Sequence, residues 1–196
     1  MLTPQTEAEV AEAVATAKGP LVVKGGGTRK GLGHGVEGTP LDVQGLAGIS
    51  LYEPGALTLV AGAGTPLTTV EAALAAEGQR LAFEPMDHRG LYGSNGTPTL
   101  GGVVAANVSG PRRIQTGACR DHMLGVRFVD GTGTIVKNGG RVMKNVTGYD
   151  LVKLMTGSHG TLGVLTEVSL KVLPALETTG VVVLAGLTDR AAIAAL

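Results

Sequence analysis

Three glycine-dense stretches constrain this chain most, because each lets the backbone turn tightly and approach another group closely. They are Lys24-Gly25-Gly26-Gly27-Thr28, the stretch from Thr99-Leu100-Gly101-Gly102 to Asn107 and Gly110, and Gly157-Ser158-His159-Gly160-Thr161-Leu162-Gly163. Without a side chain, glycine adopts positive φ and lets backbone N–H groups reach phosphate oxygens. Glycine supplies 32 of the 196 residues, well above the usual share of about 7%. The pattern predicts a backbone that wraps a long, phosphate-bearing cofactor.

Composition excludes nucleic acid as a partner. Lys plus Arg and Asp plus Glu each total 16, so the chain lacks the net basic field that sequence-independent binding needs. Aromatic residues make up 3% and tryptophan is absent, which removes the stacking platforms of single-strand binders. The 43% of hydrophobic residues can bury the core of one domain, with room for a fragment of another.

The N-terminus has no basic segment followed by an apolar run, and no window approaches the length of a membrane span. We therefore expect a cytoplasmic location with no direct membrane span. Cys119 is the single cysteine, so no internal disulfide is expected.

The order of predicted elements indicates an α+β fold. Thr6 and Glu9 form a capping box before a helix that extends to about Lys18, and the apolar run 21–23 predicts a strand that ends in the triple glycine. Further elements are predicted at 41–43, 49–51 and 58–60 (strands), from Thr65-Pro66 to Gly78 (helix with a Thr cap), at 100–107 (short helix), at 124–129 and 134–137 (hairpin) and at 164–173 (strand). This order fits two α+β subdomains, at about 1–55 and 56–174.

The pattern restarts after Pro174. Residues 181–184 predict a new strand, and Thr188 caps a predicted helix that reaches Leu196. We expect residues 175–196 to be the beginning of a second, truncated domain.

Two nucleotide-binding motifs can be set aside. Gly33-His34-Gly35-Val36-Glu37-Gly38 has the spacing of the dinucleotide fingerprint, but no strand leads into it and Thr39-Pro40 follows where a helix should begin. No segment matches Walker A, because Leu32 follows the glycine after Lys30.

Other features leave alternatives open. The triple glycine fits either a surface turn or a ligand loop, Gly101-Gly102 fits either helix packing or ligand approach, and Arg112-Arg113 fits either a solvated turn or an anion contact. Cys119 with His122 has metal-ligand spacing, but no second pair accompanies it, and His34, His88 and His159 stand alone. No metal is expected.

Read together, the three stretches resemble the FAD-binding domain of the vanillyl-alcohol oxidase/PCMH flavoprotein family in both order and spacing. Within that family, three further segments are most similar to the FAD-binding subunit of bacterial glycolate oxidase: Gly110-Pro111-Arg112-Arg113, Arg120 to Val126, and Gly140 to Leu151. The resemblance covers about Thr3 to Pro174. It implies a PCMH-type FAD-binding domain at 1–174, followed by the start of a cap-like domain.

The resemblance also implies the cofactor-binding residues. Those implied for the pyrophosphate are Gly25, Gly26, Gly27, Thr28 and Arg29; those for the pyrophosphate and flavin are Thr99, Gly101, Gly102, Ala106, Asn107, Ser109 and Gly110; those for the flavin, ribose or adenine are His159, Gly160, Thr161, Leu162, Gly163 and Leu165. Backbone N–H groups suit a diphosphate without a basic patch. Family members that attach flavin covalently place His near the first loop, where this chain has Thr28, so noncovalent FAD is expected.

The implied function is that of an FAD-dependent oxidoreductase subunit. Hydride would pass from a small 2-hydroxy acid such as glycolate to FAD, with a larger flavoprotein subunit and an iron–sulfur subunit as partners. Any association with the inner membrane would then run through those partners. Two alternatives stay open: another PCMH-type flavoenzyme, such as a D-lactate or sugar-acid dehydrogenase, and a non-catalytic structural subunit. The catalytic residues are not identified by the sequence.

Overall fold

The computed structural model describes residues 1–142 and 148–195. Residues 143–147, within the Gly140–Leu151 segment of the resemblance, and Leu196, the expected end of the last helix, lie outside the described residues.

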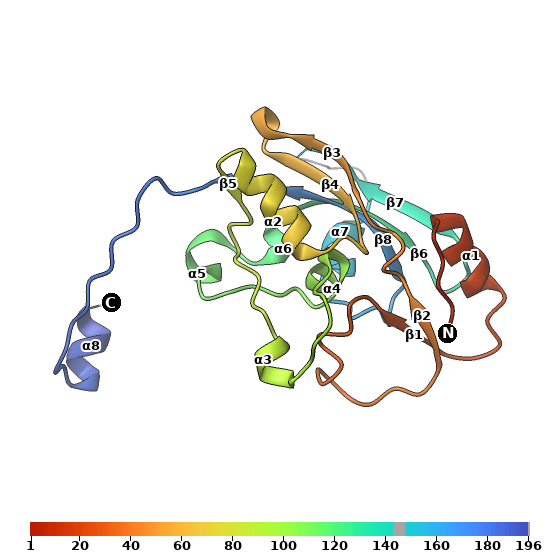
Figure 1. The fold of residues 1–196 in the computed structure, drawn as a ribbon, viewed down its shortest axis with the longest axis horizontal. Coiled ribbons are helices and arrows are strands. Elements are labelled where there is room, and N and C mark those ends of the chain that lie inside the picture. The colour runs from red at the N-terminus through yellow and green to blue at the C-terminus, as the bar shows by residue number, and fades with distance from the viewer. Residues whose placement is uncertain (143–147, 196) are drawn as a thin grey trace.

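A five-stranded antiparallel sheet forms the centre of the molecule (Figure 1). Its strands lie in the order β3 (Ile49–Glu53), β4 (Thr58–Gly62), β8 (Val164–Lys171), β6 (Met123–Val129) and β7 (Ile135–Gly139). The middle strand β8 is buried at six of its eight positions, on both faces of the sheet. The predicted hairpin is confirmed as β6–β7, with the carboxylate of Asp130 accepting the N–H groups of Thr132 and Thr134 in the turn.

Helices and loops cover one face of this sheet and enclose the larger hydrophobic core. Leu67, Val70 and Leu74 of α2 (Leu67–Ala76) pack there with Leu100 and Val103 of α4 (Leu100–Ala105). The remaining short helices are α3 (Arg89–Tyr92), α5 (Arg113–Thr116), α6 (Cys119–His122) and α7 (Leu151–Met155). Among the described residues, no helix is both long and apolar enough to cross a lipid bilayer.

The N-terminal part has its own small sheet and core. β1 (Leu21–Lys24) pairs in parallel with β2 (Thr39–Asp42), and α1 (Glu7–Ala15) packs nearby through Val10. The predicted capping box is confirmed in part: Thr6 Oγ1 accepts the N–H of Glu9 at 3.2 Å, whereas the Glu9 carboxylate accepts the N–H of Gln5 instead of that of Thr6. The helix ends at Ala15, three residues before the predicted Lys18.

Two expectations about local structure were wrong. Thr65 does not cap α2, since Pro66 occupies the N-cap and Thr65 Oγ1 instead donates to the Gly62 carbonyl at 2.7 Å and accepts the Gly48 N–H. Residues 181–184 form no strand. Their side chains are 60–86% exposed, and a strand needs a neighbour with which to share backbone hydrogen bonds.

The chain leaves the body after a short pairing of β5 (Gln79–Arg80) with β9 (Leu173–Pro174). Residues from 175 onward then extend away from the body to α8 (Asp189–Ala195) (Figure 1). The predicted boundary at Gly55 falls in a 3-10 turn, η1 (Pro54–Ala56), between the paired strands β3 and β4. The division into two subdomains stays a prediction.

Candidate cofactor site

The first and second glycine stretches lie against each other. A Cβ added to Gly26 would be 1.6 Å from the carbonyl oxygen of Thr97, and one added to Gly25 would be 2.4 Å from Thr99 Oγ1. Position 96 also has room only for glycine, since a Cβ there would be 1.7 Å from the carbonyl oxygen of Gly26. Backbone therefore meets backbone here, at separations that only glycine permits.

The third stretch joins the other two. The N–H groups of Gly157 and His159 donate to the carbonyls of Val104 and Ala105, at 3.1 and 2.8 Å, at the end of α4. A Cβ on Gly160 would lie 3.6 Å from the Cβ of Val23, in the strand that leads into the triple glycine. Residues 25–29, 96–107 and 157–160 thus form one contiguous surface.

The N-terminus of α4 has already used its hydrogen-bond donors. The N–H groups of Leu100 and Gly101 donate to the carbonyls of Thr65 and Ala63, and that of Gly102 donates to Thr99 Oγ1. A Cβ on Gly101 would be 2.7 Å from the Cβ of Ala63. Gly101 therefore lets α4 pack closely on the end of β4, and this helix end offers no N–H group of its first three residues to an anion.

The first loop, in contrast, keeps its donors open. Among the described residues, the N–H groups of Gly26, Gly27 and Thr28 donate to no protein acceptor. Gly27 has a φ of 69°, in the region that favours glycine. Consecutive N–H groups in such a turn form a concave anion-binding surface.

Arg29 adds a positive charge beside this loop that forms no ion pair with the described residues. Its Nε donates to His88 Nδ1 at 3.2 Å, while its buried Nη2 has no hydrogen-bond partner in the described part of the chain. Burial lowers the pKa of the Arg29 guanidinium. The nearby carboxylate of Asp87 is bound by Arg89, at 2.7 Å. A Cβ on Gly102 would lie 3.3 Å from Arg29 Nη1, so the cation lies between the first loop and α4.

The far end of the second stretch fixes neighbouring backbone. Asn107 Oδ1 accepts the N–H of Arg120 and Ser109 Oγ accepts the N–H of Cys119, both at 2.9 Å. The N–H of Gly110 donates to the Phe83 carbonyl at 2.8 Å. Asn107 has a φ of 48°, and Ala106 beside it is half-buried.

The predicted residues of the third stretch divide by exposure. His159, Thr161 and Leu162 are exposed, whereas Leu165 lies in the core of β8 at 6% exposure. Gly160 and Gly163 have φ of 76° and 154°.

Sequence reasoning missed two parts of this surface. Gly96 and Thr97 pack on the first loop, and the small residues of 93–97 were the available signal. Ser158 Oγ is buried and has no hydrogen-bond partner within residues 1–142 and 148–195, and its place inside the third stretch was the available signal. In the described parts of the chain, no three His, Cys, Asp or Glu side chains are grouped to hold a metal ion.

These observations fit FAD. Open N–H groups and the Arg29 guanidinium, whose Nη2 has no hydrogen-bond partner among the described residues, suit an anionic diphosphate, and Ser158 Oγ offers a further hydrogen bond.

The chain resembles known flavoproteins in both sequence and fold. It is 50% identical over 157 residues to glycolate oxidase subunit GlcE of Escherichia coli (strain K12), which covers 80% of this chain and 43% of that protein. It is 32% identical over 162 residues to a D-lactate dehydrogenase of Archaeoglobus fulgidus, covering 81% of this chain and 34% of that protein. The matched region thus spans less than half the length of these curated relatives.

The fold is confirmed by a solved structure of alkyldihydroxyacetonephosphate synthase, with a TM-score of 0.71 at 23% identity, over 90% of this chain and 32% of that one. The α+β, PCMH-type fold expected from the sequence is therefore correct. Residues 1–139 match the family described as FAD binding domain. With most of its length inside that match, the chain belongs to the FAD binding domain family, and its cofactor is FAD.

Proposed function

We propose that this chain is the FAD-binding part of a subunit of a complex that oxidises a small 2-hydroxy acid such as glycolate. The observation that carries the proposal is the single surface formed by the three glycine stretches, with open N–H groups and Arg29 at its centre. The 50% identity to glycolate oxidase subunit GlcE supports the substrate class.

The residues proposed to hold FAD are the first loop with Arg29, the second stretch and the third stretch: Gly25, Gly26, Gly27, Thr28, Arg29, Thr99, Gly101, Gly102, Ala106, Asn107, Ser109, Gly110, His159, Gly160, Thr161, Leu162, Gly163 and Leu165. The first loop and Arg29 would bind the diphosphate. Thr99, Gly101 and Leu165 would act mainly by shaping the surface, because their polar groups or side chains are already used or buried. When bound noncovalently, as we propose, FAD supplies the acceptor for a substrate hydride.

Residues 175–196 are proposed to begin a second, cap-like domain. Val181, Val182 and Val183 are 80–86% exposed, and a run of exposed apolar residues is unfavourable unless something covers it. The partners proposed are a larger flavoprotein subunit and an iron–sulfur subunit, in the cytoplasm.

A second candidate keeps the cofactor and changes the substrate. The similarity to the D-lactate dehydrogenase of Archaeoglobus fulgidus favours D-lactate. A third candidate is a non-catalytic subunit, which an absorption spectrum without flavin would support.

The function is tested by anaerobic bleaching of the flavin after purification with the native partners. We expect glycolate to bleach the flavin quickly in the complex and slowly in the isolated, FAD-loaded chain. The isolated chain lacks the partners and most of the proposed cap-like domain that would place the substrate, and correct placement supplies about 7–11 kcal/mol of barrier lowering. Acid precipitation should release the FAD. Faster bleaching by D-lactate would select the second candidate, and a complex without flavin at this chain would contradict the proposal.

A further inference from the structure

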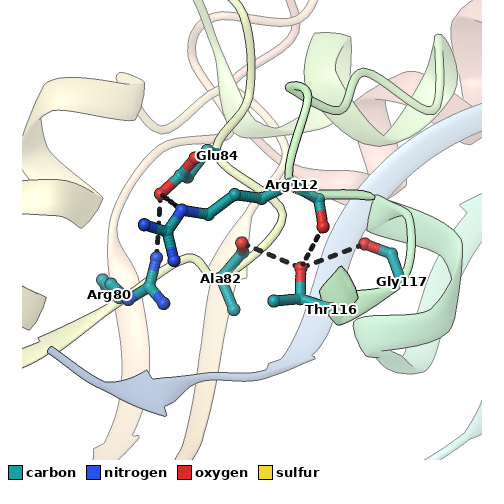
Figure 2. Close-up of polar contacts among 6 residues, drawn as sticks. All are labelled: Arg80, Ala82, Glu84, Arg112, Thr116 and Gly117. Atoms are coloured by element: carbon teal, nitrogen blue, oxygen red, sulfur yellow. Dashed lines mark hydrogen bonds and ion pairs between the residues drawn. The ribbon is translucent and has the colours of Figure 1, made fainter. Parts of the chain in front are cut away.

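One carboxylate is shared by two guanidinium groups beside the cofactor surface. Glu84 Oε1 lies 2.9 Å from Arg80 Nη1 and 3.1 Å from Arg112 Nε (Figure 2). Among the described residues, no other carboxylate lies within ion-pair distance of either arginine. The cluster of Arg80, Glu84 and Arg112 therefore carries one positive charge in excess.

The cluster also has donors to spare. Arg80 Nε is buried, and none of the described residues accepts a hydrogen bond from it. Arg112 uses Nε on Glu84, and its terminal nitrogens donate to no protein acceptor among the described residues. Arg112 is 33% exposed, so a small ligand can reach it from solvent.

The backbone holds this cluster in place. Thr116 Oγ1 donates to the carbonyls of Ala82 and Arg112, both at 3.1 Å (Figure 2). Glu84 has a φ of 46°, which is uncommon for a residue with a side chain. The Thr116 hydroxyl thus joins the segments 80–84 and 112–116, and the two guanidinium groups meet at Glu84 Oε1.

The position of the cluster relates it to the cofactor surface. A Cβ on Gly110, the last residue of the second stretch, would be 2.4 Å from the carbonyl oxygen of Glu84. Arg80 pairs with Leu173 in β9, directly before the chain leaves the body. The cluster therefore lies between the end of the second glycine stretch and the start of the proposed second domain.

We infer that Arg112, supported by Arg80 and Glu84, binds the carboxylate of the substrate acid. This inference rests on the proposed function. A carboxylate matches the planar fork of an arginine and the excess charge of the cluster. Arg112 could instead bind the FAD diphosphate, but the open N–H groups of the first loop and Arg29 already offer a binding site for that anion. Glu84 keeps the arginines in position while the site is empty.

The test uses oxalate, an unreactive carboxylate, with the FAD-loaded protein bound to its partners. Arg112→Gln should weaken oxalate binding in calorimetry and raise the KM for glycolate, each by at least about tenfold, the effect of losing a charge-assisted hydrogen bond. Arg112→Lys should restore part of the binding. Arg113→Gln is the matched control, because Arg113 is exposed and forms no ion pair among the described residues; it should leave both values unchanged.

Oxalate affinity unchanged by Arg112→Gln would overturn the inference. So would a loss of FAD affinity with unchanged oxalate binding, because Arg112 would then contact the cofactor phosphate. Calorimetry needs no turnover, so it separates the two claims: a wild-type protein that oxidises no 2-hydroxy acid contradicts the proposed function, whatever oxalate does.

Discussion

Gly26→Val should abolish measurable FAD binding, with at least about a hundredfold loss of affinity. The added Cβ would lie 1.6 Å from the Thr97 carbonyl oxygen, and no rotamer removes a clash between Cβ and backbone. The first loop and the segment around Thr97 must then separate, which opens the surface on which the cofactor lies. Because overpacking costs about 1–3 kcal/mol, the melting temperature should also fall. Flavin titration and thermal unfolding followed by circular dichroism measure both effects.

Gly35→Val is the control for this variant. Gly35 lies in the loop that follows, and a Cβ there meets nothing within 4 Å. It should keep the wild-type affinity and melting temperature. Wild-type FAD affinity in Gly26→Val would show that the first loop lies outside the cofactor site.

Arg29→Met should weaken FAD binding by about 10–150-fold without lowering the stability of the FAD-free protein. The loss follows from removing a charge-assisted hydrogen bond to phosphate, worth about 1.5–3 kcal/mol. Stability should hold or rise, because the buried Arg29 Nη2 has no partner among the residues that the structure describes, and burying such a group is unfavourable. If Arg29 had a purely structural role, Arg29→Met would instead lower the stability of the FAD-free protein and leave the FAD affinity unchanged. Titration with FAD and melting of the FAD-free protein test the two effects together.

Lys30→Met is the matched control for Arg29→Met. Lys30 is the exposed neighbour in the chain, and its loss removes the same charge from the same loop. Lys30 Nζ lies 4.0 Å from the place that a Cβ on Gly27 would take, but Lys30 is exposed and its charge is screened by solvent. Lys30→Met should therefore weaken FAD binding by less than Arg29→Met does. Equal losses in the two variants would mean that the loop's general charge, not the buried guanidinium, attracts the cofactor.

Local patterns predicted the strands of the central sheet and helices α1, α2 and α4, but not the short helices α3, α5, α6 and α7. The apolar residues of 164–173 marked β8, which is buried on both faces, and Thr6 marked the start of α1, because burial and capping depend on residues close in sequence. The prediction for Thr65 was wrong because its hydroxyl accepts the N–H of the distant Gly48 and donates to the Gly62 carbonyl, and so does not cap the helix that follows. The run 181–184 has strand composition without a partner strand, which no local pattern reveals.

The candidate site was only partly predictable for the same reason. Glycine density located the three stretches, but long-range packing decides what each glycine does: Gly26 meets Thr97, and Gly101 meets Ala63. Arg29 Nη2 has no hydrogen-bond partner among the described residues, and the nearby Asp87 is bound by Arg89; sequence spacing alone settles neither contact. The sequence likewise could not decide between a solvated turn and an anion contact for Arg112, because the ion pair that joins it to Glu84, and through Glu84 to Arg80, forms between residues far apart in the chain.

The central claim is that the three glycine stretches form one FAD site, and hydrogen exchange with and without FAD tests it most directly. The N–H groups of Gly26, Gly27 and Thr28 have no protein acceptor among the described residues, so they should exchange quickly in the free protein. FAD should slow exchange in peptides from all three stretches, 25–29, 99–110 and 157–163, at the same FAD concentration. Protection confined to one stretch, or found in none, would contradict the account.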